Sequence, residues 1–428
     1  MQTALMLTFC AGIAQAGGFT LDEAEALARQ NNEAPGLAAA RIARAQSLTR
    51  EAWASMIPSL TFSTTYTRRI SDVTRTVGEQ TVVVQQANSI GGNLTLDWPL
   101  FDARAFALID AANSGERATG QEAEELKRSL AFSVAQAFFL VLAEDALLDA
   151  AAKRTEAAAA TLSEAKARQA AGLAAKNEVT RAELELATAR LEESNGNTAA
   201  IRARSALSEL IGAPLPSGRG FVEPPPSKVP PLVADELLAR ARTNRQDLLA
   251  LTARADQAES LAKEPLLRLV PTLGVRGVLF ASNEPGLSGR TVDGNAALVL
   301  TWRIFDGGLR YEDRVQRRAD VEEARLSIRA AERHVVREVL DALTSLSAAK
   351  AAEELAIVRL EVAHQNADEV HVLYGNGLAS ALEQVDALVS AYDAAAGLSR
   401  QKVAVRIAEL DVLRALGSWP TETDQETK

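Results

Sequence analysis

Residues 302–308 read WRIFDGG, and the next Gly or Pro after them is Gly375. The segment between, Leu309 to Tyr374, would form an unbroken helix about 100 Å long at about 1.5 Å per residue, roughly three times the diameter of a small domain. Gly375-Asn376-Gly377 supplies residues that adopt left-handed backbone angles and end helices. A second helical run then extends to Gly417. The stretch therefore predicts a long helical hairpin.

The same pattern occurs earlier in the chain. Positions of the two copies match at an offset of 204 or 205 residues: Trp98 with Trp302, Phe101 with Phe305, Asp102 with Asp306, Gly172 with Gly377, and Gly212 with Gly417. A period near 200 residues is too long for a solenoid repeat, so each copy is half of the molecule. We predict a signal peptide at 1–16, a first repeat at 17–213, a Pro-rich linker at 214–232, a second repeat at 233–417 and a tail at 418–428.

The composition favours closely packed helices and gives no sign of a nucleic-acid partner. The 428 residues are 47% hydrophobic but only 4% aromatic, which suits helices in close contact better than a core of large side chains. The formal net charge is -10, and the 46 basic residues form no cluster. Phosphate-rich partners are therefore not expected.

The N-terminus has the features of a secretory signal, although no Lys or Arg precedes its apolar run. Residues 4–14 are apolar, and Ala14-Gln15-Ala16 is a small-x-small cleavage site, so we expect removal after residue 16. The single cysteine, Cys10, lies inside this segment, and the mature chain would have no disulfide. Lipidation of Cys10 is the alternative, but Phe9 stands where a small residue is required.

Each repeat opens with a further helix. Thr20 is a candidate N-cap and Glu23, three residues later, completes a capping box. This helix is predicted to run over 20–56 with an interruption or kink near Pro35-Gly36, and its counterpart over about 233–267.

Four segments alternate apolar and polar side chains with the period of a half-buried strand. They form two pairs, 59–69 with 91–100 and 272–280 with 295–303, and the polar segments between them, 69–89 and 281–294, predict loops. The apolar face comprises Leu60, Phe62, Tyr66, Leu94, Leu96, Trp98, Val275, Leu279, Leu298, Leu300 and Trp302.

Two interpretations of this apolar face remain open. A soluble sheet would need a cover, and the neighbouring helices are too long to fold back over it. Strands of this length match a membrane β-barrel, and Trp98 and Trp302 lie at strand ends, where interfacial aromatic rings are found. Lipid forbids an open strand edge and four strands cannot close, so a barrel would be shared between chains.

The expected helix lengths predict a tube. The outgoing helix at 102–171 is about as long as the return helix at 173–211 and the N-terminal helix at 20–56 together. Stacked end to end, the two shorter helices would match the longer one in height. A ring of such helices would form a conduit that opens into the barrel.

At this point the sequence resembles the TolC-like outer-membrane efflux and secretion channels. The matching motifs are TLDEAEALARQNN at 20–32, IPSL at 57–60, WPLFD at 98–102, WRIFDGG, AGLAAKNEV at 171–179, NGLASALEQV at 376–385, and the LIG and ALG repeat ends. The resemblance implies a mainly α fold with a membrane β part, in which duplicated helical hairpins form a periplasmic α-barrel. It further implies a homotrimer with a shared 12-stranded barrel. The expected function is an exit duct for a tripartite efflux or type I secretion system, joined to an inner-membrane pump through a periplasmic adaptor.

The resemblance also assigns roles to residues near the hairpin tips. Gly172, Leu173, Ala174, Gly377, Leu378 and Ala379 match the adaptor-contacting turns, and Glu178 and Tyr374 match an inter-hairpin tip network. Glu383 and Asp386 match an acidic ring that lines the tunnel, where like charges attract cations. The basic residue expected two positions after Gly377 is absent, since Ala379 stands there.

Other interpretations compete with these assignments. Glu383 and Asp386 could lie on an ordinary solvated helix face. His364 and His371 are seven residues apart, but three His, three Met and no mature Cys make a metal site unlikely on composition. No cofactor, phosphate loop or catalytic group is expected, so the protein is not predicted to be an enzyme. The competing function is a periplasmic structural or adaptor-like coiled-coil protein without a pore.

Overall fold

The computed structural model describes residues 18–78, 80–216, 218–225, 234–284 and 290–421. The expected signal peptide, parts of the Pro-rich linker and most of the C-terminal tail lie outside the described residues. The chain divides into two compact units. The first comprises Met1–Ala38, Glu124–Arg245 and Arg333–Lys428; the second comprises Ala39–Ala123 and Gln246–Glu332.

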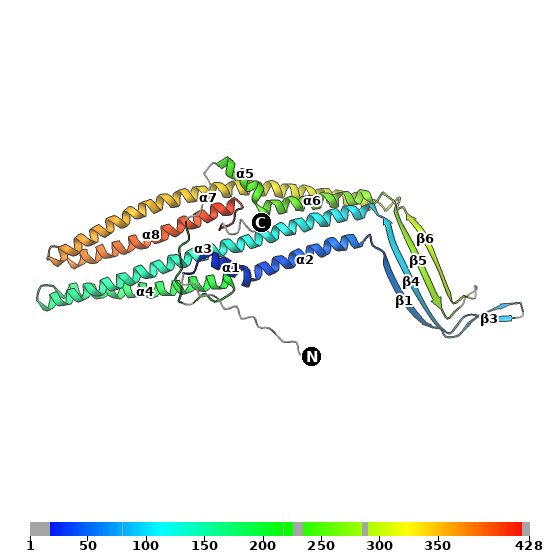
Figure 1. Ribbon diagram of the computed structural model, residues 1–428, viewed down its shortest axis with the longest axis horizontal. Helices are drawn as coiled ribbons and strands as arrows, with labels where there is room; N and C mark the ends of the chain where they lie inside the picture. Colours follow the sequence, from blue (N-terminus) through cyan, green and yellow to red (C-terminus); the bar gives the residue numbers. More distant parts are fainter. Residues whose placement is uncertain (1–17, 79, 217, 226–233, 285–289, 422–428) are drawn as a thin grey trace. The chain divides into compact units, whose positions relative to one another are not determined.

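The second unit contains an antiparallel sheet with the strand order β1-β4-β5-β6 (Figure 1). Its strands are β1 (Ser59–Arg68), β4 (Asn88–Phe101), β5 (Thr272–Ser282) and β6 (Val292–Thr301). All four predicted strands are confirmed, although β4 and β6 begin three residues earlier than expected. The strands of the two repeats meet where β4 pairs with β5. β1 and β6 are the outer strands of this sheet.

The expectation of a loop at 69–89 is wrong. This segment contains a second sheet, formed by β2 (Val73–Val77) and β3 (Gln80–Gln85). The physical reason is composition: VTRTV and QTVVVQ are rich in β-branched residues, which favour extended backbone. Gly78 has a positive φ of 68° in the connection between the two strands.

The N-terminal helix is interrupted at Asn32, three residues before Pro35, so the interruption predicted near Pro35-Gly36 is confirmed. α1 (Leu21–Asn31) ends there and α2 (Glu33–Ala54) begins. Asn32 has extended backbone, and its Oδ1 accepts a hydrogen bond from the Ala34 amide at 2.8 Å, as an N-cap does. Pro35 lies in the first turn of α2, where its missing amide costs no helical hydrogen bond.

The counterpart helix of the second repeat has a similar interruption. α5 (Ala234–Asn244) and α6 (Gln246–Leu267) are separated at Arg245. The sequence predicted a single helix over 233–267. The break at Arg245 corresponds to the break at Asn32 in the first repeat.

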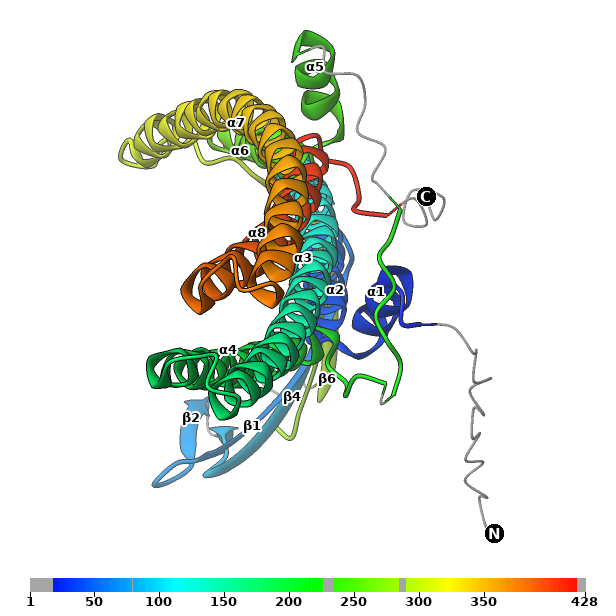
Figure 2. The same ribbon diagram turned by 90° about the vertical axis from the view of Figure 1, so that its left-hand side faces the viewer.

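The predicted helical hairpins are present, with their turns and return helices in the first unit (Figures 1 and 2). α3 (Ala103–Ala170) turns into α4 (Lys176–Ile211), and α7 (Leu309–Gly375) turns into α8 (Ala381–Ala415). Alanine dominates the helix contacts, for example in the cluster of Ala367, Ala387 and Ala391 between α7 and α8. Small side chains allow the helices to approach closely, in agreement with the alanine-rich, aromatic-poor composition.

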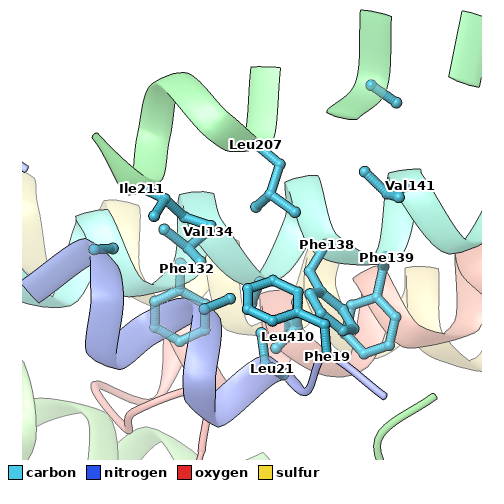
Figure 3. Packing of buried hydrophobic residues seen from close by; sticks show 14 of the residues in the cluster. Phe19, Leu21, Phe132, Val134, Phe138, Phe139, Val141, Leu207, Ile211 and Leu410 are labelled. Atoms are coloured by element: carbon cyan, nitrogen blue, oxygen red, sulfur yellow. The ribbon is translucent and has the colours of Figure 1, made fainter. Parts of the chain in front are cut away.

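A buried aromatic cluster joins α1 to the hairpins of the first unit (Figure 3). The Phe138 ring of α3 lies 6.2 Å from Phe19 and 5.4 Å from Phe221, centroid to centroid. Leu410 of α8 completes the cluster, so it contains residues of both repeats. The predicted capping box is confirmed, since Thr20 and Glu23 exchange hydrogen bonds of 3.3 Å at the start of α1.

The two repeats end in the same way. Gly212 and Gly417 follow α4 and α8 with positive φ values of 72° and 73°. A Cβ on Gly212 would lie 2.8 Å from the Asn31 carbonyl oxygen, and one on Gly417 would lie 2.8 Å from the Arg245 amide nitrogen. In each repeat the terminal glycine therefore packs on the break of the opening helix, where no side chain fits.

Candidate functional site

The hairpin tips are two turns of the same construction. Gly172 and Gly377 have positive φ values of 72° and 74°. The Leu173 amide donates to the Arg168 carbonyl at 2.9 Å, and the Leu378 amide donates to the Leu373 carbonyl at 2.8 Å. Bonds of this kind define the Schellman ending of a helix, which needs glycine at the left-handed position.

Both tips present an exposed leucine. Leu173 is 72% exposed and Leu378 is 76% exposed, although the residue at this position of a Schellman motif usually packs against its own helix. The predicted tip residues thus lie in two equivalent turns, each with an unpacked apolar side chain.

The two carboxylates proposed for the acidic ring lie on one exposed face of α8. Glu383 also has a local role, because its carboxylate accepts a hydrogen bond from the Ser380 amide at 2.7 Å while the Ser380 hydroxyl caps the Glu383 amide at 3.3 Å. This capping box lowers the pKa of Glu383, chiefly through the Ser380 backbone bond. Asp386, one turn later, is exposed.

The capping box has no equivalent at the first tip. Ala175 is the N-cap of α4 and makes no side-chain cap, so Glu178 lacks the hydroxyl partner that Glu383 has in Ser380. The two return helices therefore differ at their first turns, although the preceding turns match.

Tyr374 is buried at the second tip, where Arg168 of the first hairpin covers it. The Arg168 guanidinium carbon lies 4.6 Å from the Tyr374 ring centroid, and its Nη1 donates to the Tyr374 carbonyl at 2.7 Å. Burial raises the pKa of Tyr374; the nearby Glu178 and Glu164 also raise it, and Arg168 opposes them. Glu178, the other residue of the predicted tip network, acts on Tyr374 through its charge, whereas the direct contact with Tyr374 is made by Arg168.

Sequence reasoning missed Arg168. The expected cation two positions after Gly377 is absent, and the structure places one on the other hairpin instead. A local signal existed, because Arg168 is a basic residue in the last turn of α3, where cations favour the helix dipole.

A second arginine of α3 makes a similar contact four turns away. The Arg154 guanidinium lies 4.9 Å from the Tyr392 ring of α8. Arg154 is largely buried, with an ion pair to Glu185 at 2.8 Å and another to Glu192. Buried cations are stable when they are paired in this way, so this contact also joins the first hairpin to the second.

The histidines form no metal site in the described residues. His371 Nδ1 lies 3.2 Å from Gln384 Nε2, which links α7 to α8 near the second tip. No group of three or more His, Cys, Asp or Glu residues in the described part of the chain is placed to hold a metal ion.

The strand register places the predicted apolar residues on one face of the sheet. Phe62 pairs with Leu94, and Leu94 pairs with Leu279 on its other side. Leu298 and Leu300 are each 67% exposed in the chain.

The opposite face of the sheet is polar. Its central feature is an ion pair between the directly opposed residues Asp97 and Arg276, at 2.6 Å. The sheet therefore has one apolar face and one polar, charged face.

The sheet is open, and its strands have one apolar and one polar face. The long helical hairpins end in exposed Gly-Leu turns. This combination is typical of channel proteins of the outer-membrane type. The sequence comparison agrees, and the chain belongs to the outer membrane efflux protein family, whose model matches residues 26–213 and 237–418. A search of curated protein sequences found no significant match.

Solved structures share the fold. The outer membrane protein VceC of Vibrio cholerae is 19% identical, with 94% of this chain and 97% of that chain covered and a TM-score of 0.77. The CmeC outer membrane channel of Campylobacter jejuni is 16% identical, with 95% and 88% covered and a TM-score of 0.80. The MtrE outer membrane channel of Neisseria gonorrhoeae is 18% identical, with 93% and 89% covered and a TM-score of 0.76.

Family membership fixes the broad function. The protein is an outer-membrane efflux duct with a helical extension in the periplasm, and the members of its family are transport conduits.

Proposed function

We propose that three copies of the chain form one duct whose 12-stranded barrel crosses the outer membrane. The observation that carries this proposal is the open sheet with its apolar face. Outer strands β1 and β6 leave backbone groups unpaired, which lipid does not tolerate. Both strands are ten residues long, the length needed to cross a bilayer. Joining β6 of one copy to β1 of the next satisfies these groups and continues the antiparallel order.

The tips are proposed as the docking site of a periplasmic adaptor that connects the duct to an inner-membrane pump. Support comes from the exposed leucines Leu173 and Leu378 in two equivalent, rigid turns. Repeated in three copies, these turns would offer six similar apolar contacts. The system served is either a tripartite efflux pump or a type I secretion system, and both need a duct of this kind.

The proposed gate lies at the same end of the hairpins. Glu383 and Asp386 would face the lumen, and three copies would bring six carboxylates together where the tunnel narrows. Closely spaced carboxylates favour cations and disfavour anions. The Arg168–Tyr374 contact would hold the two hairpins of one chain together in the closed state.

Fractionation and oxidative cross-linking test the assembly. The mature chain is expected to lack cysteine, so Ser63→Cys in the middle of β1 can be combined with Asn295→Cys or, separately, Ala297→Cys in the middle of β6, both of which lie on the same face of the sheet as Ser63. Outer-membrane location, a trimer on an unheated SDS gel and disulfide-linked dimers and trimers in one of the two variants are expected. A soluble periplasmic monomer would instead favour the coiled-coil alternative, and a trimer without any cross-link would contradict the β1–β6 junction.

A further inference from the structure

The segment that joins β6 to α7 exposes an unusual amount of apolar surface. Its most exposed large side chains, between 57% and 80% exposed, are Trp302, Ile304, Phe305, Tyr311 and Val315. They continue from the exposed leucines Leu298 and Leu300 of β6 into the first two turns of α7. The apolar strip therefore extends past the end of the strand.

This segment is held in place by buried contacts, so its exposed side chains are presented by a fixed backbone. Arg310 is 3% exposed, pairs with Asp306 at 3.2 Å, and donates to the Ile304 carbonyl at 2.9 Å. The Trp302 indole donates to the Leu269 carbonyl at 3.0 Å. With its polar edge bonded to the protein, the Trp302 ring offers its apolar surface outward.

Cations border the apolar strip. Residues 303–318 contain five arginines and three acidic residues. Arg314, half-buried, and Arg318, exposed, lie one turn apart on α7, and neither has a hydrogen bond or ion pair to a described residue. The matching segment of the first repeat contains one arginine, Arg104, which is paired with Asp102 at 2.6 Å. The unpaired arginines Arg314 and Arg318 thus have no counterpart in the matching segment of the first repeat.

Helix geometry directs these cations toward the membrane side of the segment. Side chains of an α-helix lean toward its N-terminus, and the N-terminus of α7 follows β6 after the seven residues 302–308. Arg314 lies five residues into α7, about 8 Å along the helix axis. A polar headgroup layer is about 5 to 8 Å thick, so the long Arg314 and Arg318 side chains can reach back to it.

From these observations we propose that residues 302–318 bind anionic phospholipid in the periplasmic leaflet of the outer membrane. The apolar residues contact the acyl chains and interfacial carbonyls, and Arg314 and Arg318 bind the phosphate of a phosphatidylglycerol-type headgroup. This inference rests on the proposed membrane placement of β6.

The charge of the neighbouring helix argues against a second copy of the chain as the partner that covers the surface of residues 302–318. At the β1–β6 junction the helix nearest to α7 would be α2 of the next copy. α2 has exposed apolar residues, among them Leu48 and Trp53, but its sequence carries three arginines and two glutamates. A net basic helix does not neutralise Arg314 and Arg318, whereas an anionic headgroup does.

The test uses the full-length trimer reconstituted in vesicles of phosphatidylcholine with one fifth phosphatidylglycerol. After extraction, native mass spectrometry counts the lipids of each class that remain bound. Wild type is expected to retain phosphatidylglycerol above its mixing ratio. Each arginine near the membrane surface contributes roughly fivefold to the affinity for anionic lipid, so Arg314→Gln/Arg318→Gln should lower the affinity for phosphatidylglycerol relative to phosphatidylcholine by roughly 25-fold and bring the enrichment down toward the mixing ratio.

Arg329→Gln/Arg333→Gln is the matched control, with the same spacing on the same helix but about 22 Å farther along it. Its enrichment should equal that of wild type. Equal enrichment in wild type and in Arg314→Gln/Arg318→Gln would overturn the inference, as would loss of the trimer in that variant, which would identify an interface between copies. Failure of the proposed function is separate and would appear as a wild-type chain that forms no membrane trimer.

Discussion

Arg168 contacts both hairpin tips at once. Its carbonyl accepts the Leu173 amide that closes the first tip, and its guanidinium donates to the Tyr374 carbonyl of the second tip at 2.7 Å. Arg168 and Tyr374 are separated by 206 positions in the chain. The Arg168 side chain therefore couples the ends of two long helices. It acts through its hydrogen bond to the Tyr374 carbonyl and its cation–π contact with the Tyr374 ring, and not through the Tyr374 hydroxyl.

Replacing Arg168 should loosen the tips. Arg168→Gln removes a charge-assisted hydrogen bond, worth about 1.5 to 3 kcal/mol, and a desolvated cation–π contact worth up to about 2 kcal/mol. We expect a larger single-channel conductance in planar bilayers, with the trimer intact. Tyr374→Phe is the control, because the buried Tyr374 hydroxyl has no hydrogen-bond partner among the described residues. A wild-type conductance for Arg168→Gln, or equal effects of both changes, would contradict the coupling.

The acidic residues of α8 should determine cation block. If Glu383 and Asp386 line the narrow end of the tunnel, a trivalent cation on the periplasmic side should block the channel, and less so at 1 M salt, where the Debye length is about 3 Å. Glu383→Gln/Asp386→Asn should abolish the block. Gln retains the capping function of Glu383, so the helix start is preserved. An unchanged block would place both side chains on the outer, solvated face.

The block should also persist in mildly acidic solution. The capping box lowers the pKa of Glu383 below its ordinary value of 4.5, so its charge remains when the pH falls toward that value. Single-channel recordings of wild type between pH 7 and pH 5 should show an undiminished block. Loss of the block over that range would mean that the Ser380 cap does not keep the ring charged against the mutual repulsion of its carboxylates.

The sheet face can be tested with one charge on each side. Leu298→Arg places a cation on the proposed lipid face, at a cost of about 2 to 4 kcal/mol at mid-depth, and should reduce the amount of trimer in the outer membrane. Thr301→Arg, three residues later on the other face, should be tolerated. Unheated SDS gels of the membrane fraction measure both, and equal tolerance would refute the membrane orientation of β6.

The exposed tip leucines should be needed for export but not for assembly. Leu173→Asp/Leu378→Asp adds a charge to each turn without changing the glycines that form it. The double variant should reach the outer membrane as a trimer and fail to export cargo in cells that contain the pump and adaptor. Export at the wild-type level would exclude the tips as the adaptor site.

Asp411 should make the first unit less stable as the pH rises. Burial raises its pKa above the ordinary value of 3.8; Glu338 also raises it and Arg414 opposes. The folded chain therefore binds a proton that the unfolded chain releases, and stability falls as the pH rises from 3.8 through the folded-state pKa. Asp411→Asn should raise the unfolding temperature at pH 7 and have little effect at pH 3.5. Equal shifts at both values would contradict this reasoning.

The long elements were predictable because their signals are local and repeated. Absence of Gly and Pro over Leu309 to Tyr374 defines α7 to within one residue, and period-two alternation defines the four strands of the main sheet. The duplication also aligned Gly172 with Gly377, and both proved to be left-handed turn residues. The long elements and the two hairpin turns were therefore predicted correctly.

Contacts between distant segments were not predictable in the same way. Arg168 meets Tyr374 only because two hairpins lie side by side, and no pattern in either segment encodes the partner. The break lies at Asn32 and not at Pro35 itself, because the Asn32 side chain caps α2 and donates a hydrogen bond to the distant Leu210 carbonyl at 2.8 Å. The Ser380–Glu383 capping box has the S-x-x-E motif and could have been predicted from the sequence. Glu383 was instead interpreted only as a residue of the acidic ring.

The aromatic cluster of the first unit has a consequence for how such a chain could arise. Phe138 and Leu207 come from one repeat, whereas Leu410 and Leu413 of the same cluster come from the other. A chain cut within residues 214–232 would leave each fragment with part of this core. An ancestor that encoded a single repeat could therefore fold only by borrowing the missing side chains from a second molecule, and gene fusion would have converted that association into an intramolecular one.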